Sequence, residues 1–105
     1  MRRVEVSASA KADIARAAVW YENQKEGLGD MFLTAILDTI DRIALNPEGY
    51  AKAIKEARKA EVESFPYSVW FRVKDDVLVI ACLHGKRDRR LAVERASGVI
   101  PFPEP

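Results

Sequence analysis

Residues 77–87, VLVIACLHGKR, join the longest apolar run of the chain to the start of its most basic segment. Apolar side chains fill both alternating sets of positions in residues 77–83, a pattern typical of a strand buried on both faces and flanked by other strands. His84 and Gly85 end the run, and residues 84–95 then carry five basic and two acidic side chains. The pattern predicts an interior strand that ends at a basic surface, which would suit an acidic partner.

Two further strands are expected before this one, because apolar residues alternate with polar ones in the preceding segment. Their buried positions are Val62, then Val69, Phe71 and Val73. The Phe-Pro-Tyr sequence at 65–67 predicts the corner between them, and two aspartates at 75–76 predict a tight hairpin turn before the apolar run. Near the start of the chain, the valines at positions 4 and 6 alternate with polar residues and predict a short first strand.

The segment between the first strand and the others has the period of helices. Ser7 or Ser9 can cap a first helix, and Asp30 is expected to cap a second. The second helix should stop at Asn46, because the residue before a proline disfavours helical backbone. A turn near Gly27 joins the two helices as an antiparallel hairpin. Their predicted buried faces are Ile14, Ala17, Ala18 and Tyr21 in the first helix and Phe32, Ile36, Ile40 and Ile43 in the second.

The order of these elements, β-αα-βββ, predicts an α+β fold in which a helical hairpin packs on one face of a small antiparallel sheet. The polar connection at 47–57 predicts at most a short helical turn, and residues 89–97, RRLAVERAS, are a candidate for a short C-terminal helix. Residues 1–97 are therefore expected to form a single domain. Residues 98–105 are expected to form a proline-rich tail.

Composition limits the chemistry that the chain can carry. With one cysteine, Cys82, and one histidine, His84, a metal site with paired ligands is not expected. No glycine-rich phosphate loop indicates a nucleotide cofactor, and we expect no cofactor. Cys82 lies in the apolar run, where a thiol is inert, so neither a disulfide nor a Cys–His nucleophilic pair is expected. No signal peptide is recognisable and no apolar segment is long enough for a membrane helix, so we expect a soluble cytoplasmic protein.

Basic side chains bracket the predicted sheet at five positions, which are Arg58, Arg72, Lys86, Arg87 and Arg89. Antiparallel pairing could bring several of them to one side of the sheet. A convergent set of this kind can bind phosphate or an acidic surface and can stabilise negative charge. The alternative is that these residues are solvated strand ends whose ion pairs contribute little to stability. The residue pattern leaves both interpretations open.

Three segments together resemble the toxins of the RelE/ParE superfamily of type II toxin–antitoxin systems: AKADIARAAVWYENQKEGLGDMF at 10–32, RKAEVESFPYSVWFRV at 58–73 and DDVLVIACLHGKRD at 75–88. Their order and spacing carry the resemblance, which extends over residues 4–96. It implies a small toxin with the fold predicted above and a cognate antitoxin that neutralises the toxin by covering its surface. We expect an exposed apolar strip to receive the antitoxin. Trp20, Trp70 and Phe71 are the candidate residues for that strip.

The superfamily has two main activities: RelE-like members cut messenger RNA in the ribosome, and ParE-like members poison DNA gyrase. For the ribonuclease branch, Arg87 matches the arginine after the last strand, and Lys59 is a candidate match for an upstream lysine. Three other positions, where the ribonucleases have arginine, lysine and tyrosine, are occupied here by Ser68, Glu61 and Val93. RNA cleavage needs groups that take and give a proton, and His84 is the candidate substitute.

The resemblance therefore favours the gyrase-directed branch, in which the toxin is not itself an enzyme. Lys86, Arg87 and Arg89 would contact the target, with Arg58 and Arg72 in support. One alternative is a ribosome-dependent endoribonuclease that acts on messenger RNA, with Arg87, Lys59 and His84 as its candidate catalytic residues. A second alternative is an inactive binding module that acts only with its antitoxin.

Overall fold

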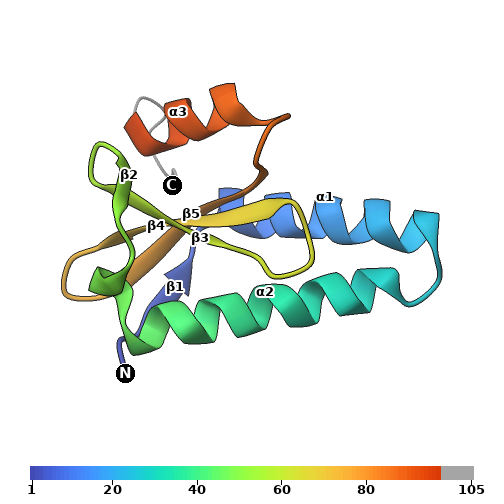
Figure 1. The fold of residues 1–105 in the computed structure, drawn as a ribbon, viewed down its shortest axis with the longest axis horizontal. Helices are drawn as coiled ribbons and strands as arrows, with labels where there is room; N and C mark the ends of the chain where they lie inside the picture. Colours follow the sequence, from blue (N-terminus) through green and yellow to red (C-terminus); the bar gives the residue numbers. More distant parts are fainter. Residues whose placement is uncertain (98–105) are drawn as a thin grey trace.

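The computed structural model describes residues 1–97, which form one sheet with helices on both faces (Figure 1). The elements are β1 (Val4–Val6), α1 (Ala8–Gln24), α2 (Leu28–Leu45), a 3₁₀ turn (Pro47–Gly49), β2 (Lys52–Ile54), β3 (Ala57–Glu61), β4 (Tyr67–Val73), β5 (Val77–His84) and α3 (Arg89–Ser97). In the sheet the strand order is β1-β5-β4-β3-β2. α1 and α2 cover one face and α3 covers the other. Within the described part of the chain, no helix is both long and apolar enough to span a bilayer. The predicted tail, residues 98–105, lies outside the described residues.

The α+β fold, the helical hairpin and the C-terminal helix are confirmed, but the sheet is mixed rather than antiparallel throughout. β1 runs parallel to β5, with Val4 opposite Val77. The alternation of valines predicts a strand there but carries no information about the direction of its partner. β2 was not expected. Its three residues are largely exposed at the edge of the sheet, so they lack the apolar alternation that marks a half-buried strand.

The N-cap of α1 is Ser7, one of the two predicted candidates, and its Oγ accepts the N–H of Ala10 at 3.1 Å. The prediction that Asp30 caps α2 is wrong. α2 begins at Leu28 and its N-cap is Gly27, whose φ of 89° is a conformation that glycine adopts without strain. Residues 25–27 join the two helices, as the sequence predicts, and Asp30 lies in the first turn of α2.

The carboxylate that caps α2 comes from Glu22 on α1. Glu22 accepts the N–H groups of Gly27, at 3.0 Å, and of Gly29, at 2.9 Å. These two hydrogen bonds hold the pKa of Glu22 below its usual value. Gly29 also lies close to α1, because a Cβ at this position would be only 2.8 Å from the carbonyl oxygen of Ala18. The hairpin is thus closed by a tight backbone contact.

The core on the α1–α2 face consists of bulky apolar side chains. Phe32 is fully buried and contacts the rings of Phe65 and Tyr67, with both pairs of ring centroids 5.2 Å apart. Tyr21 completes this aromatic cluster with a centroid 4.9 Å from that of Phe65. The remaining buried members of this face include Ile36, Ile43, Val69, Phe71, Val77 and Val79.

A second and smaller core lies between the sheet and α3. The sheet contributes Trp70, Ile80 and Leu83, whereas α3 buries only Ala92 and Ala96. β5 is an interior strand, as predicted, and it contains a bulge: Trp70 pairs with Ala81 but Phe71 pairs with Val79, which leaves Ile80 unpaired. β1 reaches only as far as Val79, so the second half of β5 has no strand on its outer side.

Candidate macromolecule-binding site

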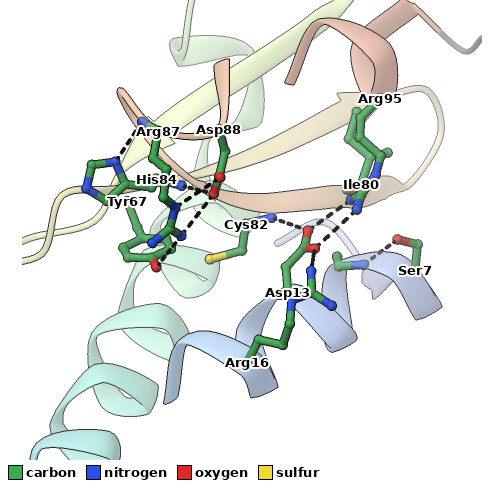
Figure 2. A network of polar contacts seen from close by, with 11 residues as sticks. Ser7, Asp13, Arg16, Tyr67, Ile80, Cys82, His84, Arg87, Asp88 and Arg95 are labelled. Atoms are coloured by element: carbon green, nitrogen blue, oxygen red, sulfur yellow. Dashed lines mark hydrogen bonds and ion pairs between the residues drawn. The ribbon is translucent and has the colours of Figure 1, made fainter. Parts of the chain in front are cut away.

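The segment His84–Arg87 forms a tight turn between β5 and α3. The N–H of Gly85 donates to the carbonyl of Pro66 at 3.0 Å. The Nδ1 atom of His84 accepts the backbone N–H of Lys86 at 3.2 Å. It also accepts the backbone N–H of Arg87, at 3.1 Å (Figure 2). Since Nδ1 accepts both bonds, the ring proton of the neutral imidazole lies on Nε2. His84 therefore shapes the turn, and its Nδ1 cannot serve as a general base in this arrangement.

Arg87 is held by two neighbours. Its guanidinium donates to the hydroxyl of Tyr67 at 3.0 Å and to the carboxylate of Asp88 at 3.1 Å (Figure 2). The hydrogen bond from Arg87 lowers the pKa of Asp88, and the backbone N–H of His84, which donates to the same carboxylate, adds to this effect. The side chain of Arg87 is still 61% exposed, so it is oriented but remains accessible to a partner.

A buried ion pair joins α1 to α3 across the outer side of β5. Asp13 of α1 accepts hydrogen bonds from Arg95 at 2.9 Å, from Arg16 at 2.8 Å and from the N–H of Cys82 at 3.0 Å. Arg95 also donates to the carbonyl of Ile80, at 3.0 Å. Figure 2 shows the side chains of Arg16 and Arg95 converging on Asp13. The ion pair therefore supplies hydrogen-bond partners for backbone groups in the bulged part of β5, where no neighbouring strand can do so.

Neither Asp13 nor Arg95 was expected as a key residue. One signal was present, because Asp13 falls at helical spacing between Ala10 and Ala17 on the buried face of α1. A carboxylate at such a position must be paired or hydrogen-bonded. Its partner could not be found from the sequence, because Arg95 lies near the other end of the chain.

The structure does not bring the five bracketing cations to one rim. Arg58 and Arg72 lie on opposite faces of the sheet, since Arg58 is paired opposite Phe71 and neighbouring residues of a strand point to opposite sides. Arg58 donates to the carbonyl of Tyr50, and Arg72 donates to the carbonyl of Ala96 at 2.6 Å. Both guanidinium groups therefore hold local structure together.

Lys86 and Arg87 lie in the turn that follows β5, and Arg89 is the first residue of α3. Lys86 and Arg89 are exposed, and in residues 1–97 no side-chain hydrogen bond or ion pair engages either of them. These three cations form the basic turn, which is the part of the predicted rim that is available for an acidic partner.

A cavity of about 320 Å³, called here the α3 pocket, lies between α3 and the sheet. Its lining includes Lys59, Ser68, Trp70, His84, Arg89 and Val93. Three positions of the ribonuclease pattern, Lys59, Ser68 and Val93, thus meet in this pocket. Arg87 is not among its lining residues and lines the groove on the other side of β5 instead. The ribonuclease candidates are therefore not assembled as one catalytic set.

A groove of about 550 Å³ runs between α1, the outer side of β5 and α3, and is called here the α1 groove. Its lining includes Arg16, Val19, Trp20, Leu83, Arg87 and Leu91. Trp20 is 54% exposed, whereas Trp70 is 7% exposed and Phe71 is fully buried. Of the three residues expected to receive an antitoxin, only Trp20 is thus on the surface.

The remaining candidates for covalent or metal chemistry are inert in this structure. Burial raises the pKa of the Cys82 thiol to about 12, which keeps it protonated and unreactive at neutral pH. Residues 1–97 contain no group of three or more His, Cys, Asp or Glu side chains that could hold a metal ion.

Comparison with known proteins agrees with the fold. Residues 4–89 match a family model described as the ParE toxin of type II toxin–antitoxin systems, parDE. Among solved structures, the chromosomal ParDE toxin–antitoxin system from P. aeruginosa is similar, with a TM-score of 0.68 and 18% sequence identity over 80% of this chain and 96% of that chain. At this identity the similarity shows a shared fold alone. No curated protein sequence matches the chain.

Proposed function

Because the chain belongs to the ParE toxin family of type II toxin–antitoxin systems, we propose that it arrests growth by poisoning DNA gyrase and that a cognate antitoxin neutralises it. We choose gyrase over RNA because the positions where the ribonucleases carry catalytic residues are occupied here by other residue types. Ser68 stands where the resemblance predicts a strand arginine, and its hydroxyl donates to Glu61 at 2.9 Å. This pair supplies no cation for a phosphate.

The basic turn is the proposed contact with the target. Lys86 and Arg89 are exposed and can form ion pairs with an acidic surface, and the guanidinium of Arg87 is held by Tyr67 and Asp88. A guanidinium that is already oriented loses little side-chain entropy on binding. Arg58 and Arg72 bind backbone carbonyls within the fold, so we do not assign them to target binding. The proposed target-binding residues are therefore Lys86, Arg87 and Arg89.

Purified gyrase and supercoiled plasmid test this proposal directly. We expect the toxin to increase cleaved plasmid, and we expect a Lys86→Ala/Arg89→Ala variant to lose most of that effect. A Lys11→Ala/Lys25→Ala variant removes the same charge from α1 and its C-cap, and it should still increase plasmid cleavage. Unchanged plasmid together with ribosome-dependent cuts in messenger RNA would move the assignment to the endoribonuclease. Harmless expression without any antitoxin gene would favour the binding module.

The α1 groove is the proposed site for the antitoxin. Val19 and Trp20 are 60% and 54% exposed, and Arg16 and Arg87 also line the groove. An apolar surface flanked by cations suits a peptide with apolar anchors and acidic neighbours.

Affinity for the cognate antitoxin tests this second surface. We expect Trp20→Ala to weaken binding by about 30-fold, the size of an interface hot spot. Leu45→Ala serves as the matched control, because Leu45 is 67% exposed and lies at the far end of α2. Equal affinities of the two variants would remove the α1 groove from the interface.

A further inference from the structure

We propose that a cavity at the C-terminal end of α3 is occupied by residues 98–105 of the same chain, and that Ile100 and Phe102 are the side chains that enter it. The cavity, called here the hairpin pocket, has a volume of about 600 Å³. Its lining includes Lys55, Arg72, Lys74, Leu78, Ala96 and Ser97. The contact lies within one chain and does not depend on gyrase being the target.

The hairpin pocket lies where two strand turns meet the end of α3. Lys55 is in the turn between β2 and β3, and Lys74 follows β4 in the turn before β5. Ser97 is the final residue of α3 and also lines the pocket. In Figure 1 the two turns and the end of α3 lie at the same end of the molecule. The basic turn precedes Arg89 at the opposite end of α3, so an occupied hairpin pocket leaves the proposed target contact free.

Apolar surface in the hairpin pocket is incompletely covered. Arg72 and Leu78 are directly opposite each other on β4 and β5, so their side chains share one face of the sheet. This is the face toward α3, because Arg72 donates to the carbonyl of Ala96. Leu78 is only partly buried, since α3 presents an alanine here. A further apolar side chain that covers this surface would stabilise the fold.

Among residues 1–97, Arg72 has one polar atom without a partner. Its guanidinium donates to the carbonyl of Ala96 at 2.6 Å through one Nη atom. Its Nε is buried, and no group in the described part of the chain accepts its hydrogen. An unpaired buried donor is costly. Because Arg72 lines the hairpin pocket, a backbone carbonyl from a segment in the pocket would supply the acceptor.

Residues 98–105, GVIPFPEP, follow directly after Ser97, which lines the pocket. At roughly 3.4 Å per extended residue, Ile100 and Phe102 reach no farther than about 10 and 17 Å from Ser97. Each of the two precedes a proline, a position that favours extended backbone, and alternate residues of an extended strand point to the same side. The segment is therefore suited to present two large apolar side chains together. The prolines also restrict the undocked segment, which lowers the entropic cost of docking.

Charge and tethering also favour this occupant. The lining has three cations and two acidic residues, and one of the latter, Glu56, is already paired with Lys52 at 2.8 Å. Lys55 and Lys74 are exposed, and Glu104 supplies a carboxylate of the opposite charge. A segment joined directly to α3 has an effective concentration on the order of millimolar, so weak contacts suffice to hold it.

NMR spectroscopy of the full chain tests the proposal. We expect nuclear Overhauser cross-peaks between the ring protons of Phe102 and the methyl groups of Leu78, with relative intensities that do not change on dilution. In an equal mixture of ¹³C-labelled and unlabelled chains, a spectrum filtered for intermolecular contacts should lack these cross-peaks. Their absence from the uniformly labelled chain overturns the proposal. Intermolecular cross-peaks overturn it as well, and they assign the pocket to a second copy of the chain.

Hydrogen exchange of paired variants measures what the contact does. Ile100→Ala/Phe102→Ala should accelerate amide exchange in residues 94–97 by about 10-fold or more, because the end of α3 loses an apolar contact. Leu37→Ala/Leu45→Ala removes two exposed leucines from α2 and should leave these amides unchanged. Wild-type rates in the first variant, or equal acceleration in both, overturn the proposal. Gyrase inhibition is a separate measurement, so either proposal can fail without the other.

Discussion

On the α1–α2 face the sheet packs against Phe32, Ile36 and Ile43, whereas on the α3 face it packs against Ala92 and Ala96. The first contact consists of bulky side chains and excludes water over a wide area. The second depends on Arg72, which donates to Ala96, and on Arg95, which pairs with Asp13. α3 is therefore held by a few directed polar contacts.

This difference accounts for the α3 pocket. Alanines are too short to fill the space between a helix and a sheet, so the α3 pocket remains open beside Ala92. Large apolar side chains on the other face interlock and leave no such space around Phe32, which is fully buried. Bulky side chains fill the contact on one face of the sheet, and the small side chains of α3 leave a cavity on the other.

The largest effect is expected from Phe32→Ala, which would break the aromatic cluster on the α1–α2 face. Loss of a fully buried ring should lower the free energy of unfolding by about 4 kcal/mol, because the cavity is only partly refilled. Urea unfolding measures this change. Leu37→Ala on the same helix is the control: Leu37 is 64% exposed, and its loss should cost less than about 0.5 kcal/mol. Similar losses in both variants would mean that this face is not the core.

A loss of about 3 kcal/mol is expected from Arg95→Met, because Asp13 is almost completely buried and would lose its main partner. Hydrogen exchange should show this loss mainly in residues 89–97, with residues 32–43 of α2 still protected. Arg90→Met, which changes an exposed arginine of the same helix, is the control. If protection fell equally in α2 and α3, the two faces of the sheet would not differ in how firmly their helices are attached.

Gly29→Ala tests how far the tight packing of the α1–α2 face extends toward the turn. The new Cβ would lie 2.8 Å from the carbonyl oxygen of Ala18, so the helices must separate, at a cost of about 2 kcal/mol. At Gly85 a Cβ would meet nothing nearer than Pro66, at 3.9 Å, and Gly85→Ala should therefore be almost neutral. Thermal unfolding of the two variants would show whether close approach, rather than loss of glycine itself, sets the cost.

The smallest effect is expected at the start of α3, from Asp88→Asn. The pKa of Asp88 is lowered by the hydrogen bond from Arg87, so its ionised form stabilises the fold above the usual carboxyl pKa of about 4. This contribution, less than about 1 kcal/mol for a partly exposed pair, is lost as the pH falls through the pKa of the folded protein. The difference between wild type and variant should thus be present at pH 7 and vanish in acid. A difference that stays constant down to pH 2 would rule out this ion pair as its source.

The helices and the three longer strands could be predicted because each has an apolar face with a regular period. β2 could not, since an exposed three-residue edge strand forms by pairing with β3 and has no apolar face of its own. The parallel direction of β1 also has no local signature, because alternating valines suit either direction.

The candidate site was harder to predict than the fold. Whether Arg58 and Arg72 share a face depends on strand register, and a shift of one residue moves a side chain to the other side of the sheet. The role of His84 as a backbone acceptor depends on the turn geometry, which residue type alone does not reveal. The pairing of Asp13 with Arg95 depends on the whole fold.

The parallel pairing of β1 with β5 has a consequence for synthesis of the protein. β1 leaves the ribosome first, but its partner begins only at Val77, so the sheet cannot close until most of the chain has been made. The basic turn and α3 follow still later, and the ion pair between Asp13 and Arg95 cannot form until Arg95 emerges. A nascent chain that has not yet reached Val77 therefore lacks both the closed sheet and the surface proposed for the target.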